Sequence, residues 1–379
     1  MNGLHAEVMA GAHGAIGVLT LQRPHSLHAL DVALVDALFA QLQDWQTDAR
    51  IAAVFLQAQG DKAFCAGGDL HGLYDAMRAH HASAQAADAC ANQAALNFFS
   101  HEYRLDYLLH RYRKPLLCWG NGLVLGGGLG LLAGAAFRVV TEHSKLAMPE
   151  AAIGLFPDVG ASWFLARIPR RLGRFLAISG AQLQADDICA AGLADYRLPH
   201  QLRSRVLESM IMQTWTADAA HNHGVLARLL HTVSMQDGLP AQPGPLQIHA
   251  SRLQLLCQLG NAQEAAQALL EWDEADAWLR CAQDYVRSAC PAMLELAWRI
   301  QDAARHLSLA AALRLELGVA LRCAQGPDFV EGIRALLIDK DRQPQWRLPS
   351  AAMADWLQPL WPAAQHPLHD LEQIDECTV

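Results

Sequence analysis

The amino-acid sequence predicts an α/β core up to about residue 200 and a mainly helical region after it. Before that point, short apolar runs alternate with segments of helical spacing and with glycine-containing loops, a pattern typical of α/β folds. After it, the chain is rich in Ala, Leu, Gln and Arg, which form helices readily. We therefore expect an α/β core over residues 1–200 and a helical region over residues 201–379.

The predicted core opens with two strands and a helix. Ile16–Gln22 and Ile51–Ala58 are apolar runs of strand length. Between them, Asp31–Trp45 carries leucines at helical spacing, with Asp31 as a suitable N-cap. The glycine-containing segment Gly60–Gly68 predicts a loop. Further strands and helices follow at Leu96–Leu109 (helix), Pro115–Trp119 (strand), from Leu129 (helix), Arg138–Thr141 (strand) and Lys145–Met148 (strand).

In the second half, helix-forming residues dominate three long segments. The clearest break among them is Asp237–Pro245, whose glycines and prolines predict a linker. The segments are Arg203–Thr232, Leu246–Trp278 and Val286–Cys323.

Composition and charge exclude several classes of protein. Hydrophobic residues make up 52% of the chain and charged residues 18%, which suits a compact fold rather than a disordered one. A net charge of -9 disfavours nucleic acid as a partner, although a few local Lys or Arg can still hold phosphates. No apolar stretch approaches the roughly 18 residues of a membrane span, because Leu123–Val140 is glycine-rich and contains Arg138.

The cysteines and the N-terminus predict a cytoplasmic protein. The chain has 9 cysteines, scattered and without a C-x-x-C pair, as expected for free thiols in a reducing compartment. Met1–Ala10 lacks a basic start and an apolar run, so we expect no secretory signal.

Three adjacent glycines, Gly126–Gly128, stand where an apolar strand meets a helix. Backbone N–H groups at such a place can stabilise an anion or a developing oxyanion. Two other interpretations stay open. The glycines could form a turn that lets a helix pack closely, and Gly128-x-Gly130-x-x-Ala133 formally matches a dinucleotide-binding fingerprint.

Two further segments have the composition of an active site. The small-residue loop Lys62–Leu70 would expose more N–H groups, and Lys62 is placed to meet a phosphate, unless it is a solvated surface lysine. In Met148–Gly160, the carboxylates Glu150 and Asp158 lie 8 positions apart (158 minus 150) within apolar sequence. Desolvation there would raise their pKa values and suit them to base or nucleophile work. They could instead be helix-terminal or turn residues.

Together these segments resemble the crotonase (enoyl-CoA hydratase/isomerase) superfamily. The stretches KAFCAGGDL, NGLVLGGGLG and AMPEAAIGLFPDVG occur in the order found in that superfamily. The segments FFSHEY, GLFPDVG and EGIRALLIDKD are similar to its 3-hydroxyisobutyryl-CoA hydrolase branch in particular. The resemblance covers roughly residues 15 to 348, and it implies a crotonase-type ββα spiral core with a helical C-terminal region.

The resemblance also implies roles for individual residues. Gly68 and Gly127 match the two oxyanion-hole donors, Glu150 the catalytic glutamate and Asp158 its acidic partner. Glu102 matches a substrate-contacting glutamate. The zone that holds the CoA nucleotide matches Arg23, His25, Lys62 and Ala66.

A departure from the superfamily pattern favours one reaction. Hydratases generally use a second glutamate two positions beyond the glycine triplet, and that position is Gly130 here. A glycine cannot orient water through a side chain. The prediction is therefore hydrolysis of a short β-hydroxyacyl-CoA, with 3-hydroxyisobutyryl-CoA of valine breakdown implied by the resemblance.

Alternatives of two classes remain at this point. An enoyl-CoA hydratase or isomerase is the first, since some superfamily isomerases use a single glutamate. A non-catalytic acyl-CoA-binding protein is the second. We expect an acyl-CoA substrate, no cofactor beyond the CoA of that substrate, no metal, no nucleic acid and no membrane. Superfamily members often form trimers or hexamers, so a homo-oligomer stays open.

Overall fold

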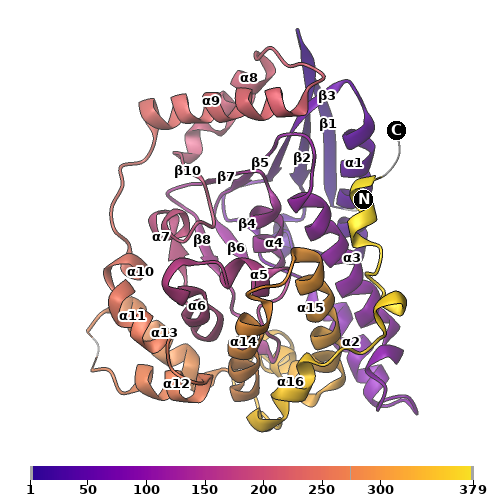
Figure 1. The fold of residues 1–379 in the computed structure, drawn as a ribbon, viewed down its shortest axis with the longest axis vertical. Helices are drawn as coiled ribbons and strands as arrows, with labels where there is room; N and C mark the ends of the chain where they lie inside the picture. Colours follow the sequence, from indigo (N-terminus) through magenta and orange to yellow (C-terminus); the bar gives the residue numbers. More distant parts are fainter. Residues whose placement is uncertain (1–2, 274, 377–379) are drawn as a thin grey trace.

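The computed structural model describes residues 3–273 and 275–376, within which the strands form two sheets (Figure 1). The larger sheet has the order β1-β2-β3-β5-β7-β10, and the smaller one has the order β4-β6-β8-β9. The strands of the larger sheet are β1 (Leu4–Gly11), β2 (Gly14–Leu21), β3 (Ile51–Ala58), β5 (Leu116–Gly120), β7 (Phe137–Val140) and β10 (Tyr196–Arg197). Those of the smaller sheet are β4 (Ala63–Cys65), β6 (Leu123–Leu125), β8 (Lys145–Ala147) and β9 (Leu183–Gln184).

Helices surround both sheets. In the first half of the chain they are α1 (Val32–Thr47), α2 (Leu70–His81), α3 (Gln93–His110), α4 (Gly127–Gly134), α5 (Ala161–Leu165), α6 (Leu172–Ser179) and α7 (Ala185–Ala190). The later ones are α8 (Arg203–Ile211), α9 (Ala219–Asp237), α10 (Pro245–Ile248), α11 (Ala250–Leu256), α12 (Ala262–Leu270), α13 (Ala277–Ser288), α14 (Pro291–Ala304), α15 (Leu309–Gln325) and α16 (Pro327–Ile333). A π-helix, Arg334–Ile338, continues α16.

The chain passes repeatedly from the larger sheet to the smaller one. β3, β5 and β7 are parallel neighbours in the larger sheet, and each is followed by a strand of the smaller sheet, β4, β6 or β8. Helices α2, α4 and α5 follow these pairs in turn. This repetition is the predicted crotonase-type ββα spiral, which is confirmed.

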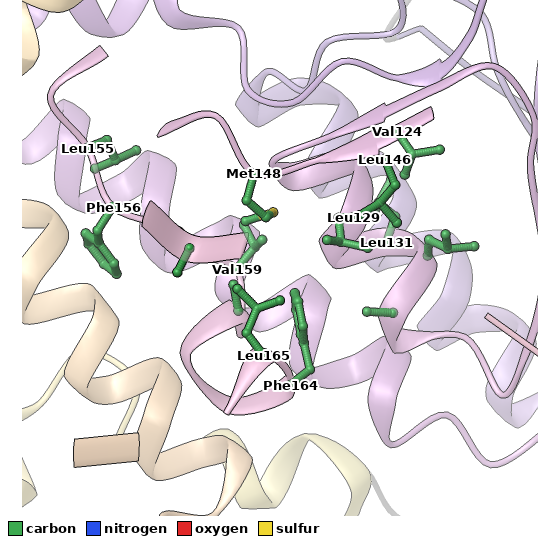
Figure 2. Packing of buried hydrophobic residues seen from close by; sticks show 14 of the residues in the cluster. Val124, Leu129, Leu131, Leu146, Met148, Leu155, Phe156, Val159, Phe164 and Leu165 are labelled. Carbon is green, nitrogen blue, oxygen red and sulfur yellow. The ribbon is translucent and has the colours of Figure 1, made fainter. Parts of the chain in front are cut away.

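The two faces of the larger sheet contribute to different hydrophobic cores. One face packs with α8 and α9, which lie across the top of the molecule in Figure 1. The other core lies among the two sheets, α1, α3 and the C-terminal helices α14–α16. Figure 2 shows part of this core, where Met148, Leu155 and Phe156 follow β8 and Leu129 and Leu131 belong to α4.

Several predicted elements are confirmed with their local causes. Strand β3 spans Ile51–Ala58 as predicted. The Asp31 side chain caps α1 by accepting a hydrogen bond from the Leu34 N–H at 2.8 Å. The apolar runs predicted as β2, β5, β7 and β8 form strands within two residues of the expected bounds.

Other expectations were wrong. The predicted loop Gly60–Gly68 contains strand β4, which is too short for periodicity to reveal but is buried and pairs with β6. The glycine triplet is not wholly a turn, since α4 begins at Gly127 rather than at Leu129. The long helical segments of the second half are divided into shorter helices, and Leu246–Trp278 becomes α10 to α12 and the start of α13. The hairpin strand β1 was not predicted.

The last strand ends at Arg197, and helices dominate the described chain after it. These later helices share a hydrophobic core with the sheets, so the predicted boundary at residue 200 stays a prediction. The described cysteines are free thiols, as predicted, and Cys377 lies outside the described residues.

Candidate active site

A cavity of about 410 Å³ lies beside α3, where β4, β6 and β8 end. Its walls include the loop after β4, the start of α4 and the segment after β8. Leu336 and Leu337 of the π-helix add a wall from the C-terminal region. The cavity brings together most of the predicted site residues, namely Ala66, Gly68, Glu102, Gly127, Glu150 and Asp158.

Two backbone N–H groups are available at this cavity. Gly68 and Leu30 form an isolated parallel β-bridge, in which Leu30 bonds to the residues on either side of Gly68. The Leu30 N–H donates to Gly67 O at 2.8 Å, and the Asp69 N–H donates to Leu30 O at 2.7 Å. The Gly68 N–H therefore points away from Leu30. Gly127 is the first residue of α4, where an N–H has no acceptor within the helix. Neither N–H donates a hydrogen bond in the described part of the chain, and the two groups suit a developing oxyanion.

Glycine is required at the start of α4 for two reasons. Gly126 has φ 49° and ψ -121°, a conformation that residues with a Cβ atom rarely adopt. A Cβ atom at Gly126 would also lie 2.8 Å from Oε1 of Glu150, and one at Gly127 would lie 2.3 Å from Oε1 of Glu102. The absence of side chains thus lets two carboxyl groups approach the α4 N-terminus.

Glu150 begins the short 3₁₀ helix Glu150–Ile153, directly after Met148 and Pro149. Its side chain is buried, and its Oε2 atom has no hydrogen-bond partner among the described residues. Burial raises the pKa of Glu150 well above its usual value, and the nearby Asp158 raises it further. The desolvation predicted from the apolar neighbours of Glu150 is therefore present. A carboxyl group in this state is suited to proton transfer.

Asp158 also lines the cavity, from the turn before α5, and is buried. The Tyr103 hydroxyl donates a hydrogen bond to Asp158 Oδ2 at 2.8 Å. Burial raises the Asp158 pKa to about 7, although the hydrogen bond from Tyr103 opposes that rise. Asp158 thus changes its charge near neutral pH.

Glu102 reaches the same cavity from α3, with 3% of its surface exposed. Its pKa is raised well above the usual value by burial and then by the charge of Asp158. Its Oε1 atom lies against Gly127 and has no hydrogen-bond partner among the described residues. Glu102 therefore has an oxygen beside one of the two N–H donors.

The residues predicted to hold the CoA nucleotide are only partly brought together. Ala66 lines the cavity. Arg23 lies at its rim, because its guanidinium pairs with Asp69, a lining residue, at 2.9 Å. His25 and Lys62 are exposed and do not belong to the lining that the structure describes.

Three buried polar residues around the site were not predicted. Tyr103 belongs to the FFSHEY segment but was given no role. Glu316 of α15 accepts hydrogen bonds from Gly160 N at 2.7 Å and Ser162 N at 3.0 Å, which fixes the turn after Asp158. Asp106 lies one helical turn after Glu102. Glu316 carried the same signal as Glu150, a carboxylate between apolar residues, but it lies far along the sequence from the motifs.

The structure explains why Gly130 bears no side chain. A Cβ atom there would lie 2.6 Å from Oδ1 of Asp106 and 3.0 Å from Cβ of Val159. Both neighbours are buried, so neither can move aside easily. The Asp106 side chain of α3 thus occupies the space that a glutamate at position 130, as in a hydratase, would need.

Comparison with known proteins identifies relatives along most of the chain. A family model described as enoyl-CoA hydratase/isomerase matches residues 16–356. The chain is 34% identical over 343 residues to a mitochondrial 3-hydroxyisobutyryl-CoA hydrolase of Danio rerio, covering 90% of this chain and 85% of the relative. It is 32% identical over 341 residues to the Homo sapiens protein of the same name, covering 90% and 84%.

Solved structures of similar fold include two enzymes of CoA esters. An enoyl-CoA hydratase from Rhodobacter sphaeroides superposes with a TM-score of 0.76 at 31% identity, covering 94% of this chain and 97% of that chain. A carnitinyl-CoA dehydratase from Mycobacterium thermoresistibile gives a TM-score of 0.80 at 28% identity, covering 95% and 97%.

The predicted cellular location is not confirmed. Every helix in residues 3–273 and 275–376 is too short or too polar to cross a bilayer. The hydrolase relatives have names that place them in mitochondria, so the cytoplasm stays a prediction for this chain.

Proposed function

Because this chain belongs to the enoyl-CoA hydratase/isomerase family, we propose that it hydrolyses 3-hydroxyisobutyryl-CoA to CoA and 3-hydroxyisobutyrate. This reaction would give it a place in valine breakdown. The proposal rests on one cavity that brings the N–H groups of Gly68 and Gly127, which donate to no described residue, together with the buried carboxyl of Glu150. Such a set fits attack on a thioester carbonyl.

The thioester oxygen would lie between the N–H groups of Gly68 and Gly127. Attack on the carbonyl carbon places negative charge on this oxygen, and the two donors stabilise that charge more in the transition state than in the substrate. Loss of one such donor typically costs on the order of 3 kcal/mol, or about a hundredfold in rate.

Glu150 would act in one of two ways. As a nucleophile it attacks the carbonyl and expels CoA, forming a mixed anhydride that water then opens. As a general base it takes a proton from water, which attacks the carbonyl directly. Turnover in ¹⁸O-labelled water distinguishes the routes, since an anhydride opened at the enzyme carbonyl leaves ¹⁸O in Glu150. A general base leaves Glu150 unlabelled.

Asp158 and Glu102 would act on the acyl part of the substrate. Both line the cavity that contains Glu150, and both have carboxyl groups able to accept a hydrogen bond from the 3-hydroxyl. Asp158 also has the pKa, about 7, to exchange a proton during turnover. We assign Asp158 to holding the hydroxyl or assisting proton transfer, and Glu102 to substrate contact.

We assign the CoA nucleotide to the region of Arg23, His25, Lys62 and Ala66, which the structure brings together only in part. Ala66 lines the cavity, and the exposed Lys62 and His25 lie on the segments that flank it, where they can meet phosphate groups. Arg23 contributes a positive charge already shared with Asp31 and Asp69.

Two other functions make different predictions. A hydratase or isomerase would add water to crotonyl-CoA or move its double bond without releasing CoA. The lack of room at Gly130 is unfavourable for the second glutamate that hydratases generally use. A non-catalytic acyl-CoA-binding protein would bind both thioesters and release nothing.

The test follows thiol release from 3-hydroxyisobutyryl-CoA and from crotonyl-CoA, together with the double-bond absorbance of the latter. The proposal predicts rapid thiol release from the hydroxy ester and a persistent crotonyl absorbance. A blank without substrate corrects for the protein's own thiols. Loss of the crotonyl absorbance without thiol release would instead make the protein a hydratase, and no change in either signal would leave a binding protein.

A further inference from the structure

Helix α3 presents two carboxyl groups to α4, one helical turn apart. A Cβ atom on Gly127 would lie 2.3 Å from Oε1 of Glu102, and one on Gly130 would lie 2.6 Å from Oδ1 of Asp106. Glu102 and Asp106 are four positions apart, and residues at that spacing on a helix lie on the same face, roughly 5–6 Å from each other. Glu102 and Asp106 therefore lie side by side against the same face of α4.

The Asp106 carboxyl group is buried without a hydrogen-bond partner among the described residues. The residue is 1% exposed, and neither of its carboxyl oxygens has a hydrogen-bond partner within the described residues. Oε1 of Glu102 is also unpaired there. An unpaired carboxylate at such depth is strongly destabilising, so a native fold rarely keeps one ionised.

Within residues 3–273 and 275–376, the charged groups found to act on Asp106 are all acidic. They are Glu102 of the same helix, Asp158 of the turn before α5 and Glu316 of α15. Asp106 in turn acts on the Cys65 thiol of β4. His110 lies one turn further along α3 than Asp106, and burial lowers its pKa to about 4, which keeps it neutral. Burial, followed by the charges of Glu102, Asp158 and Glu316, raises the pKa of Asp106 well above its usual value.

We propose that Asp106 is a neutral carboxylic acid that donates its O–H to Glu102 and thereby holds the Glu102 carboxylate in place at the cavity. The hydrogen bond would provide partners for two buried oxygens that otherwise have none. Asp106 does not line the cavity, so it is a positioning residue. Its effect on turnover rests on the proposed role of Glu102 in substrate contact.

The neutral acid also serves the oxyanion site. Glu102 Oε1 lies beside Gly127, whose N–H is one of the proposed oxyanion donors. One carboxylate there can be stabilised by the positive end of α4. A second carboxylate one turn away would oppose the negative charge that develops on the thioester oxygen. Protonation of Asp106 removes this repulsion while the carboxyl still fills the space against Gly130.

The direct test is the protonation state of Asp106 in the full-length protein. Infrared spectra of wild type and Asp106→Asn at pH 7 are expected to differ by the carbonyl band of a protonated carboxyl group, present in wild type alone. A difference in the carboxylate bands instead would mean that Asp106 is ionised and would overturn the proposal. This readout needs no turnover, so it stands even if the protein hydrolyses no thioester.

Kinetic measurements then show whether Asp106 acts as a hydrogen-bond donor or only fills space between α3 and α4. Asp106→Asn keeps the shape and an N–H donor, so kcat should stay within about tenfold of wild type, whereas Asp106→Leu should lower kcat by about a hundredfold. Asp75→Asn, at an exposed position of α2, is the control and should leave kcat unchanged. Equal losses in Asp106→Asn and Asp106→Leu, or no loss in either, would contradict the donor role. If Asp106→Leu fails to fold, the infrared comparison decides.

Discussion

Buried carboxyl groups dominate the chemistry of this protein at the level of single residues. Glu102, Glu150 and Asp158 share one cavity, and burial raises the pKa of each. Carboxylates this close cannot all be ionised in an apolar environment, so protons are held among them. The site is therefore prepared to give and accept protons near neutral pH, as thioester hydrolysis requires.

The Tyr103 hydrogen bond provides a test of this electrostatic account. If ionised Asp158 is needed, kcat/KM should rise up to tenfold per pH unit below about 7, the Asp158 pKa, and level off above it. Tyr103→Phe removes a hydrogen bond that lowers this pKa, so the midpoint should move to higher pH. Steady-state kinetics between pH 5.5 and about 9 measure the shift.

The control is Tyr112→Phe. It removes a buried hydroxyl that donates to Leu42 O at 2.9 Å, away from the cavity. That variant should keep the wild-type midpoint. A midpoint that stays fixed, or falls, in Tyr103→Phe would mean that Asp158 does not set the profile.

At the level of elements, the contact between α3 and α4 selects the chemistry. Gly127 and Gly130 allow α3 to bring its carboxyl groups against α4. An α4 with side chains at these positions would push α3 away and move Glu102 out of the cavity. The glycine at position 130, where hydratases generally have a glutamate, is therefore required by the way α3 packs against α4.

Gly130→Glu is accordingly expected not to create a hydratase. The new side chain would collide with Asp106 and Val159, and overpacking of this kind typically lowers the unfolding free energy by about 1–3 kcal/mol. This loss exceeds the stabilisation expected from the higher helix propensity of glutamate relative to glycine. Urea unfolding and a crotonyl-CoA hydration assay check both parts. Gly72→Glu in α2 is the matched control, since a Cβ atom there meets nothing within 4 Å. Hydration of crotonyl-CoA by a stable Gly130→Glu protein would contradict this account.

Helix α15 reaches the active site from the C-terminal region. The Glu316 carboxylate accepts hydrogen bonds from the N–H group of Gly160, on the turn that carries Asp158, and from that of Ser162, in the first turn of α5. Glu316→Ala leaves these buried donors unpaired, so we expect a loss of about 2–4 kcal/mol of unfolding free energy and a lower kcat. Urea unfolding and thiol release measure both. Glu208→Ala, at an exposed position of α8, should change neither, and an unaltered kcat in Glu316→Ala would argue against support of Asp158 by α15.

At the scale of the whole molecule, the C-terminal region completes the site. Cys290 N donates to Ala151 O at 2.9 Å, and Ala152 N donates to the Tyr285 hydroxyl at 3.1 Å. These contacts fix the 3₁₀ helix that begins with Glu150. Leu336 and Leu337 of the π-helix line the cavity from the same side. The helical region and the spiral core therefore build one active site together.

The buried carboxyls around the site should also make stability depend on pH, namely Glu102, Asp106, Glu150, Asp158 and Glu316, whose pKa values are all raised by burial. Their folded pKa values lie above the unfolded values near 4, so the folded state binds more protons and loses stability as pH rises through the folded values. Asp158 at about 7 and Glu316 at about 8 place part of this loss between pH 6.5 and roughly 8. Below that window His110 and His366, whose pKa values are lowered to about 4 by burial, act in the opposite direction.

We expect the unfolding free energy to fall by up to about 1.4 kcal/mol per pH unit for each carboxyl that stays protonated. Urea unfolding of wild type and Glu316→Gln across this window measures the slope. The variant should show the smaller slope, because it lacks one of the groups that bind a proton in the folded state. A stability that rises with pH in the wild type would refute the raised pKa values.

Features that depend on a local sequence pattern could be predicted from the sequence alone. Strand β3 and the Asp31 cap follow from an apolar run and from a side chain placed before a helix. The motifs located Gly68, Gly127, Glu102, Glu150 and Asp158, which the structure gathers around one cavity.

Features that depend on tertiary contacts could not be predicted. Strand β4 is 3 residues long and exists because β6 pairs with it. The roles of Asp106 and Glu316 depend on which helix faces which, and residue spacing along the chain does not contain that information. The same is true of Gly130, whose lack of room is set by α3 and by Val159.

Thiol release from 3-hydroxyisobutyryl-CoA by wild type, Glu150→Gln and Glu208→Gln tests directly whether Glu150 performs the hydrolysis. We expect kcat to fall roughly a thousandfold or more in Glu150→Gln, because both proposed routes need the Glu150 carboxylate. Glu208 is exposed on α8, so Glu208→Gln should match wild type. Wild-type thiol release from a correctly folded Glu150→Gln protein would show that Glu150 does not perform the hydrolysis, and would contradict the account.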